Sequence, residues 1–317
     1  MEADKTPAPK AATAEDLFRK GNQAYKDLDC ELACSFFKQA IDLQPVYPEA
    51  YNNWGVALSD MFEKTGDDKL MAACIDKYRK ATKLKPSYAT AYYNWANLLL
   101  EVAEMKDDEN LYAESLEKYR LAAKITPNDA DVFFSWANAL MAYAELRKDD
   151  LDEKMYEMAY KRFARALELR PDDAEIYSNW AMALSSLAFK TKNTELYEQA
   201  FDKYLQAVNL RPESIRIRFN WGLDLIDYAK LKGGVEKYRT DIESKLMGAY
   251  KLKSGKALYN LTCFYSTVNE VDTAMCWLED MLENTNVPRS FVEIEPDFEN
   301  IRKDKRFVEL LDKYRPE

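Results

Sequence analysis

Apolar residues recur along most of the chain at the spacing of one helical face, in paired segments separated by short polar breaks. One such face keeps the i, i+3, i+4, i+7 pattern of an amphipathic helix and consists of Tyr88, Tyr92, Trp95, Ala96, Leu99, Val102 and Ala103. The polar stretch DDEN follows, and a second apolar face then runs to Pro127, which cannot continue a helix. Two such faces cannot both be buried within one hairpin, so neighbouring hairpins must stack.

The same pattern returns at a fixed period. Tryptophan and, nine residues before it, proline recur with steps of 41, 41, 44 and 41 residues, at Trp54, Trp95, Trp136, Trp180 and Trp221 and at Pro45, Pro86, Pro127, Pro171 and Pro212. An aromatic residue and an alanine keep the same step between each tryptophan and the next proline, as Tyr78 and Ala81 do in one unit. A residue used five times in this way is typical of a repeat array and not of one active site.

The order of small, aromatic and proline residues resembles the tetratricopeptide repeat, a helix–turn–helix unit of about 34 residues. The first unit fits that length with Gly21, Ala33, Phe37, Ala40 and Pro45. The next four units have 41 or 44 residues and a tryptophan where the family commonly has leucine. Seven extra residues make about two helical turns, and one extra turn on each helix would keep both apolar faces in phase. The array therefore resembles the longer tetratricopeptide-like class of about 42 residues.

The resemblance implies an all-α fold, a right-handed α-solenoid of stacked helix–turn–helix repeats with a C-terminal capping segment. We expect a disordered leader at residues 1–13, an array of about seven units at 14–284, and a capping segment at 285–317. A solenoid exposes its apolar end unless something covers it. The residues expected to cover it are Phe291, Phe298, Ile301, Phe307 and Leu310.

The tryptophans are expected to be core residues, on the face of each first helix that meets its own second helix. The glycine or alanine that follows each tryptophan would allow the two helices to approach closely, because packed helices fit large residues beside small ones.

The composition of the chain excludes several classes of function. The net charge of −10 argues against a nucleic-acid partner, since phosphates are bound by basic surfaces. No apolar run approaches the roughly 18–20 residues that span a bilayer, so we expect no membrane insertion. The N-terminus has no hydrophobic region of a signal peptide, and five cysteines without CxxC spacing are expected to be reduced core thiols. These features predict a cytoplasmic protein.

The sequence shows no catalytic machinery. It has no histidine, which removes Ser-His-Asp, Cys-His and HExxH sites, and it has no phosphate-binding glycine loop. Carboxylate pairs such as Asp107/Asp108 and Asp172/Asp173 fall at expected helix starts, where they cap free N–H groups. We expect a chain that is not an enzyme and that uses no cofactor or metal.

The resemblance places a partner-binding groove on the first helices of the repeats. The residue before each tryptophan would project into it, and it is usually asparagine, an amide that can both donate to and accept from a peptide backbone. Asparagine could equally serve only to pack the helices, and both readings stay open here. The expected groove residues are Asn22, Asn53, Tyr93, Asn94, Asn97, Phe134, Asn138, Asn179, Arg216 and Asn220.

A second groove column changes sign along the array. It is mostly acidic in the earlier units, at Glu49, Asp131 and Glu175, and basic later, at Arg216 and Lys256. These charges would orient an extended partner, or they form only a solvated rim.

A further resemblance can be tested on single residues. Chaperone-binding arrays grip the C-terminal carboxylate of Hsp70 or Hsp90 with lysine, arginine and asparagine. Asn22 and Asn53 match the asparagine positions, but Phe18, Thr90 and Asn94 stand where the cations belong. A carboxylate clamp without cations fails electrostatically, so this partner is not expected.

The leading interpretation is a non-enzymatic adaptor or scaffold that binds a segment of another protein in the concave groove. The alternative is a structural subunit of a larger assembly that contacts its neighbours through the convex face. Exposed apolar patches on the second helices would favour the alternative.

Overall fold

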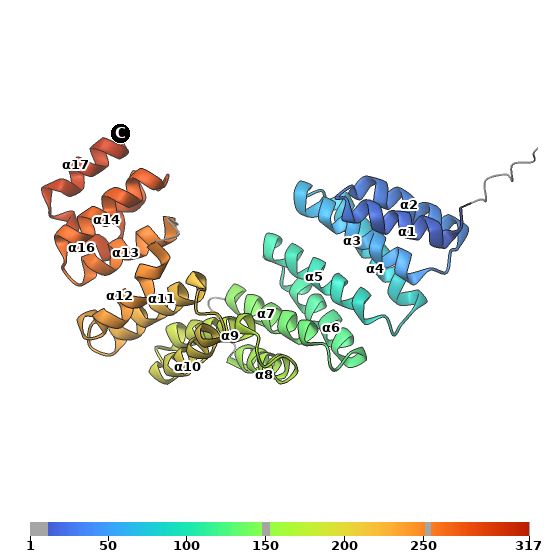
Figure 1. Ribbon diagram of the computed structural model, residues 1–317, viewed down its shortest axis with the longest axis horizontal. Helices are drawn as coiled ribbons and strands as arrows, with labels where there is room; N and C mark the ends of the chain where they lie inside the picture. Colours follow the sequence, from blue (N-terminus) through green and yellow to red (C-terminus); the bar gives the residue numbers. More distant parts are fainter. Residues whose placement is uncertain (1–11, 148–152, 251–254, 317) are drawn as a thin grey trace, which may run out of the picture. The chain divides into compact units, whose positions relative to one another are not determined.

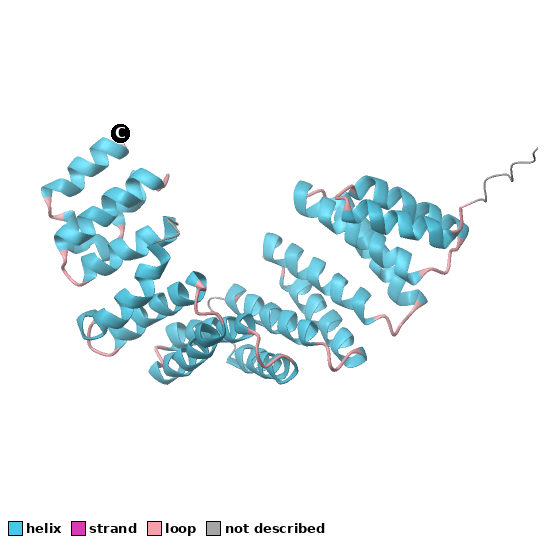
Figure 2. Cartoon of the chain, in the orientation of Figure 1, coloured by secondary structure: helices cyan, strands magenta, loops and turns pink. Residues whose placement is uncertain are grey.

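The structure is a computed structural model that describes residues 12–147, 153–250 and 255–316. Residues 1–11 of the predicted leader lie outside this description. Within the described ranges the chain forms helices joined by turns and no strand (Figure 2). The helices come in antiparallel pairs, each pair packed on the next within its part of the chain (Figure 1). The predicted all-α array of stacked helix–turn–helix repeats is confirmed.

The described chain falls into two compact units, which meet in sequence between Leu169 and Arg170. The first unit contains four hairpins. Their helices are α1 (Ala14–Lys26), α2 (Cys30–Leu43), α3 (Pro48–Thr65), α4 (Asp68–Leu84), α5 (Ala89–Lys106), α6 (Glu109–Ile125), α7 (Ala130–Leu146) and α8 (Glu153–Leu169).

The second unit contains three hairpins and a C-terminal segment. The hairpin helices are α9 (Ala174–Thr191), α10 (Thr194–Leu210), α11 (Ile215–Leu231), α12 (Arg239–Tyr250), α13 (Gly255–Thr267) and α14 (Val271–Asn284), with a 3-10 turn η1 (Val235–Tyr238) before α12. The C-terminal segment comprises α15 (Arg289–Ile294), η2 (Pro296–Phe298), α16 (Glu299–Arg302) and α17 (Lys305–Tyr314).

The extra residues of the longer repeats are divided between both helices of a hairpin. The first hairpin has helices of 13 and 14 residues, whereas α5 and α6 have 18 and 17. The difference is about one turn for each helix, as the repeat length predicts. Short polar residues set the helix starts: the side chains of Asp108 and Asp173 accept hydrogen bonds from backbone N–H groups of the first turn, which have no partner within the helix.

The two helices of a hairpin meet where a small residue faces an aromatic ring. A Cβ atom added to Gly55 of α3 would lie 2.7 Å from the ring of Tyr78 of α4, and one added to Gly21 would lie 2.6 Å from the ring of Phe37. Both rings are 1% exposed. The residue after the tryptophan is therefore small because the ring of the second helix occupies the space of a side chain, as the sequence predicts.

The C-terminal segment packs on α13 and α14. Phe298, Ile301 and Phe307 are buried in the core of the second unit, in agreement with their expected covering role. Phe291, however, is 42% exposed, and its neighbour Val292 is buried instead. The amphipathic face of α15 is thus one residue out of phase with the expected one.

Candidate functional site

The first helices of the first unit, α1, α3, α5 and α7, lie side by side (Figure 1). We call the face that these helices share the first-helix surface. A chain of amide hydrogen bonds links three of them: Asn94 Nδ2 donates to Asn52 Oδ1 at 3.1 Å, Asn52 Nδ2 to Asn53 Oδ1 at 3.0 Å, and Asn53 Nδ2 to Asn22 Oδ1 at 2.7 Å. Asn52 is only 3% exposed. These amides therefore hold adjacent repeats together, and they use part of their hydrogen-bonding capacity within the protein.

Other predicted groove residues of this unit also contact neighbouring helices. The Tyr119 hydroxyl of α6 donates to Asn97 Oδ1 at 2.5 Å, and the Tyr93 hydroxyl lies 3.1 Å from Ser135 Oγ of α7. The ring of Phe134 lies 6.2 Å from that of Phe163. Asn138 lies on α7 and is partly exposed. These predicted residues thus lie on α5 and α7, and Asn97, Tyr93 and Phe134 contact a neighbouring helix.

In the second unit, the predicted groove residues lie on α9 and α11. Asn220 Nδ2 approaches Met182 Sδ at 3.2 Å, and Asn179 is partly exposed. Arg216 forms an ion pair with Glu175 at 3.7 Å. In the first unit, Glu49 pairs with Lys85 at 2.8 Å. Part of the predicted charge column is therefore neutralised inside the protein.

Each repeated tryptophan carries a cation from the second helix of its own hairpin, a feature that sequence reasoning missed. The cationic group lies 4.0–4.4 Å from the ring centroid in five pairs: Lys77 on Trp54, Lys118 on Trp95, Arg162 on Trp136, Lys203 on Trp180 and Lys245 on Trp221. The sequence signal was a lysine or arginine 23 to 26 residues after every tryptophan.

The tryptophans also contact the preceding hairpin. Trp136 packs against a cluster formed by Ala122 and Ala123 of α6 and Val132 of its own helix. Trp54 packs against the cluster that contains Ala33 and Phe37 of α2. The expectation that the tryptophans are core residues holds fully for Trp95, which is buried, whereas the other four rings are partly exposed beneath their cations.

An uncompensated group of carboxylates lies two helical turns from the asparagines. Asp60 and Glu63 on α3 and Glu101 and Glu104 on α5 form this group, which we call the acidic patch. Burial raises the pKa of Glu101, and repulsion from Glu63, Glu104 and Asp60 raises it further. Within the described ranges, no lysine or arginine forms an ion pair with any of the four.

These positions follow from the repeat. Asp60 and Glu101 each stand seven residues after the asparagine that precedes the tryptophan of their helix, and a spacing of seven returns to the same helical face. Sequence reasoning missed the acidic patch because it followed the columns before and near the tryptophan only. The patch can hold a cationic group, since four carboxylates offer only acceptors.

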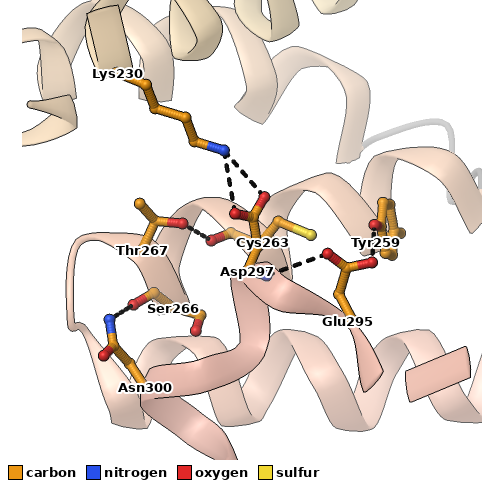
Figure 3. A network of polar contacts seen from close by, with 8 residues as sticks. All are labelled: Lys230, Tyr259, Cys263, Ser266, Thr267, Glu295, Asp297 and Asn300. Atoms are coloured by element: carbon orange, nitrogen blue, oxygen red, sulfur yellow. Dashed lines mark hydrogen bonds and ion pairs between the residues drawn. The ribbon is translucent and has the colours of Figure 1, made fainter. Parts of the chain in front are cut away.

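A polar network joins the C-terminal segment to the second unit (Figure 3). Lys230 of α11 donates to both carboxylate oxygens of Asp297, at 3.1 and 3.2 Å, and the Tyr259 hydroxyl of α13 donates to Glu295 at 2.5 Å. Burial raises the pKa of the nearby Cys263 thiol to about 12.

This network includes a possible metal-ligand set. One potential ligand atom from each of Cys263, Glu295 and Asp297 lies within 4.8 Å of the others, and the set is the only one found in the described chain. Lys230 donates a hydrogen bond to Asp297, and Tyr259 donates one to Glu295. The two carboxylates are therefore already hydrogen-bonded, in contacts that hold the C-terminal segment on α11 and α13.

Comparison with known families gives one match. Residues 67–220, just under half of the chain, match the family model described as plant specific mitochondrial import receptor subunit TOM20. The expectation of a plain cytoplasmic location is wrong in view of this match, because the similar family is mitochondrial. The N-terminal signals on which that expectation relied do not report every address. No helix among the described residues has the length and apolarity to cross a membrane. No curated protein sequence matches the chain.

A solved structure with a TM-score above 0.5 shares this fold. A tetratricopeptide repeat protein from Parabacteroides merdae superposes with a TM-score of 0.56 at 13% identity, over 93% of this chain and 98% of that one. MamA from Desulfovibrio magneticus has a TM-score of 0.49 at 15% identity, over 65% and 99% of the two chains. YrrB, described as a TPR protein with an unusual peptide-binding site, has a TM-score of 0.47 at 21% identity, over 68% and 91%. With its repeated motif, its stacked helix hairpins and the first of these neighbours, the chain has the fold of the tetratricopeptide repeat proteins.

Proposed function

We propose that this protein is a non-enzymatic adaptor that binds a segment of another protein on the first-helix surface. The acidic patch carries this proposal. Its four carboxylates lie on adjacent first helices, and no lysine or arginine that the structure describes forms an ion pair with them. Burial, together with repulsion from the other three carboxylates, raises the pKa of Glu101. Such an arrangement costs free energy in the isolated protein, and a cationic partner would relieve it.

The partner segment should therefore be basic. Exposed and half-exposed charges of this kind mainly set the rate and orientation of association, while apolar contacts supply most of the affinity. Two partly exposed aromatic side chains offer such contacts: Tyr93 lies on α5 with part of the patch, and Phe134 lies on the next first helix, α7. A helix with one basic and one apolar face would meet both requirements.

The family match favours mitochondria as the cellular location of this activity. The matched model is that of a mitochondrial import receptor subunit, and it includes α5 with Glu101 and Glu104. Mitochondrial targeting segments are amphipathic, rich in arginine and poor in acidic residues. The acidic patch has the charge needed for such a segment. We therefore propose that the protein acts at mitochondria and that its partners are targeting segments of other proteins.

Three other partner classes receive less support. The acidic patch would repel a phosphate backbone, as does the net charge of −10. The carboxylate of a chaperone C-terminus would meet Asn22 and Asn53, which are bonded to each other, and no clamp cation. Large exposed apolar side chains on the described second helices, such as Leu43, Leu84 and Leu205, number at most two on any one helix. Scattered apolar residues are normal for a protein surface, so they do not favour an assembly through that face.

The proposal can be tested with a synthetic peptide. The probe is a fluorescein-labelled amphipathic helix of about 15 residues with arginines on one face, and fluorescence anisotropy measures its binding to the full chain at low and high salt. Changing the acidic patch to amides (Asp60→Asn, Glu63→Gln, Glu101→Gln, Glu104→Gln) should weaken binding about tenfold or more at low salt. The difference should shrink at high salt, because salt screens exposed charges.

A matched control removes four exposed carboxylates from second helices. The control variant carries Glu31→Gln, Asp42→Asn, Glu109→Gln and Glu153→Gln, which change the net charge by the same amount. It should bind the probe within about twofold of the wild type. If both variants weaken binding equally, the peptide senses only net charge. In that case, or if the wild type does not bind the probe, the proposal is refuted.

A further inference from the structure

A separate cavity lies in the second unit, between α11, α13 and the C-terminal segment. It has a volume of about 170 Å³, several times what one water molecule requires. Its floor is apolar, with Phe264 fully buried and Ile226 9% exposed. Its rim is polar, and the side chains of Lys230 and Asp297 there are 39% and 34% exposed. The cavity can therefore accept a group from solvent onto an apolar floor.

The polar groups of this cavity offer acceptors. The Asn260 amide uses a hydrogen on the Lys256 carbonyl at 2.7 Å, and the Thr267 hydroxyl donates to the Cys263 carbonyl at 2.8 Å. Both residues consequently have oxygen lone pairs left for a ligand. No described residue donates a hydrogen bond to the carboxylate of Asp227, which also lines the cavity. A ligand with several N–H donors would satisfy these groups.

The charge of the residues that line the cavity also favours a ligand with N–H donors, and a cationic one in particular. Asp227 and Asp297 contribute two carboxylates, and Lys230 contributes one ammonium, which is already bound to Asp297 (Figure 3). The carboxylate of Asp227 is thus left as one unbalanced negative charge. Burial is the main reason that its pKa is raised; Asp297 adds to the rise, and Lys230 and Lys192 oppose it. A partly buried carboxylate without a hydrogen-bond donor is an unfavourable arrangement that a bound cation would correct.

We propose that this cavity binds the side chain of a lysine of the partner segment, with its aliphatic part on Ile226 and Phe264 and its ammonium between Asp227 and Asn260. The ammonium supplies three donors to the acceptors of the rim, and the four methylene groups match the apolar floor. Asp297 comes from the C-terminal segment, so that segment both covers the last hairpin and completes the cavity. This inference rests on the proposed adaptor function and names one specificity element of the partner.

The test uses blocked lysine, N-acetyl-lysine N-methylamide, with the full chain labelled at the methyl groups of isoleucine and leucine. Leu223 and Ile226 line the cavity, so their methyl resonances report its occupation in NMR titrations. Blocked lysine should shift both resonances in a saturable way, and blocked norleucine, which has a similar chain without the charge, should bind at least tenfold more weakly. The Asp227→Asn variant should lose at least tenfold in affinity for blocked lysine.

Lys230→Met provides the opposing control. Removing this ammonium makes the cavity more negative, so blocked lysine should bind severalfold more tightly. Weaker binding to Lys230→Met would overturn the proposal, as would equal binding of blocked norleucine, which would indicate an apolar pocket. Binding of n-butylammonium without binding of blocked lysine would also overturn it, because the cavity would then take free amines and no side chain. Circular dichroism checks that each variant keeps its helices.

The outcome can be separated from that of the adaptor proposal. The cavity is tested with blocked lysine alone and lies in the second unit, whereas the arginine peptide tests the acidic patch of the first unit. If the peptide binds and blocked lysine does not, the cavity inference fails and the adaptor proposal stands. If blocked lysine binds and the peptide does not, the adaptor proposal fails, and the cavity remains a lysine site without an assigned partner surface.

Discussion

Replacing Gly55 by alanine should destabilise the protein, although alanine is the better helix former. A Cβ at this position would lie 2.7 Å from Tyr78 Cε1 and 3.0 Å from two further atoms of the same ring. The ring is 1% exposed in the core between α3 and α4, so it cannot move into solvent. The added methyl group must therefore push the two helices apart or force the tyrosine out of its rotamer.

The size of the effect follows from two opposing contributions. Alanine stabilises a helix interior by about 1 kcal/mol relative to glycine. Overpacking a tight core costs about 1–3 kcal/mol, and three close ring atoms place this site at the upper end. The net result is a loss of about 1–2 kcal/mol in the free energy of unfolding. Gly248 of α12 is the matched control, because a Cβ there would meet no atom closer than 4.0 Å, so Gly248→Ala should stabilise by up to about 1 kcal/mol.

Urea unfolding followed by circular dichroism measures both changes. In a Tyr78→Leu background the ring is gone, so Gly55→Ala should become neutral or stabilising there, and the double-mutant cycle gives the coupling directly. A Gly55→Ala protein at least as stable as the wild type would show that the ring yields easily. The close-approach explanation of the small residue would then be wrong.

Three further outcomes are expected. Lys118→Met removes the cation from Trp95 and should lower stability by about 0.5–1 kcal/mol in the same urea assay; no loss would mean that the contact contributes nothing. Burial raises the pKa of Asp224 to about 7, so the folded state keeps a proton that the unfolded state loses near pH 4, and stability should fall as pH rises from about 4 to 7. Asp224→Asn should flatten this dependence and be the more stable protein at pH 8, by at most about 4 kcal/mol, whereas a less stable variant at that pH would contradict the assignment. Asn94→Ala leaves the buried Asn52 oxygen without its donor and should cost about 1–3 kcal/mol in thermal melts; an unchanged melting temperature would show that water replaces the amide.

The fold was predictable because its signals repeat. Proline and aspartate mark the helix boundaries in unit after unit, and the interval between tryptophans gives the length of both helices. The register of a single helix without a repeated neighbour was less secure. In the C-terminal segment the expected Phe291 and Leu310 stand one position before the buried Val292 and Leu311, because a short helix offers too few turns to fix its phase.

The candidate site was only partly predictable. Asn22, Asn53 and Asn94 were identified from the sequence, but the hydrogen bonds that link them, one of them through Asn52, depend on how adjacent hairpins pack and leave no trace in one sequence. The predicted polarity of the charge column overlooked ion pairs within and between repeats, as between Glu49 and Lys85 in one repeat and between Arg216 and Glu175 in adjacent ones. The cavity needs Asp297, which follows the last hairpin and approaches α11 only in the folded chain.

The cation above each repeated tryptophan makes that tryptophan an intrinsic fluorescence probe of its hairpin. Indole emission responds to a charge held about 4 Å from the ring, so separation of a hairpin's two helices must change the spectrum of that hairpin's own tryptophan. Five successive hairpins each contain one tryptophan of this kind. Because stability in a repeat array depends on nearest neighbours, the array can open in parts. Variants that keep a single one of these tryptophans would record where opening begins and how far it spreads.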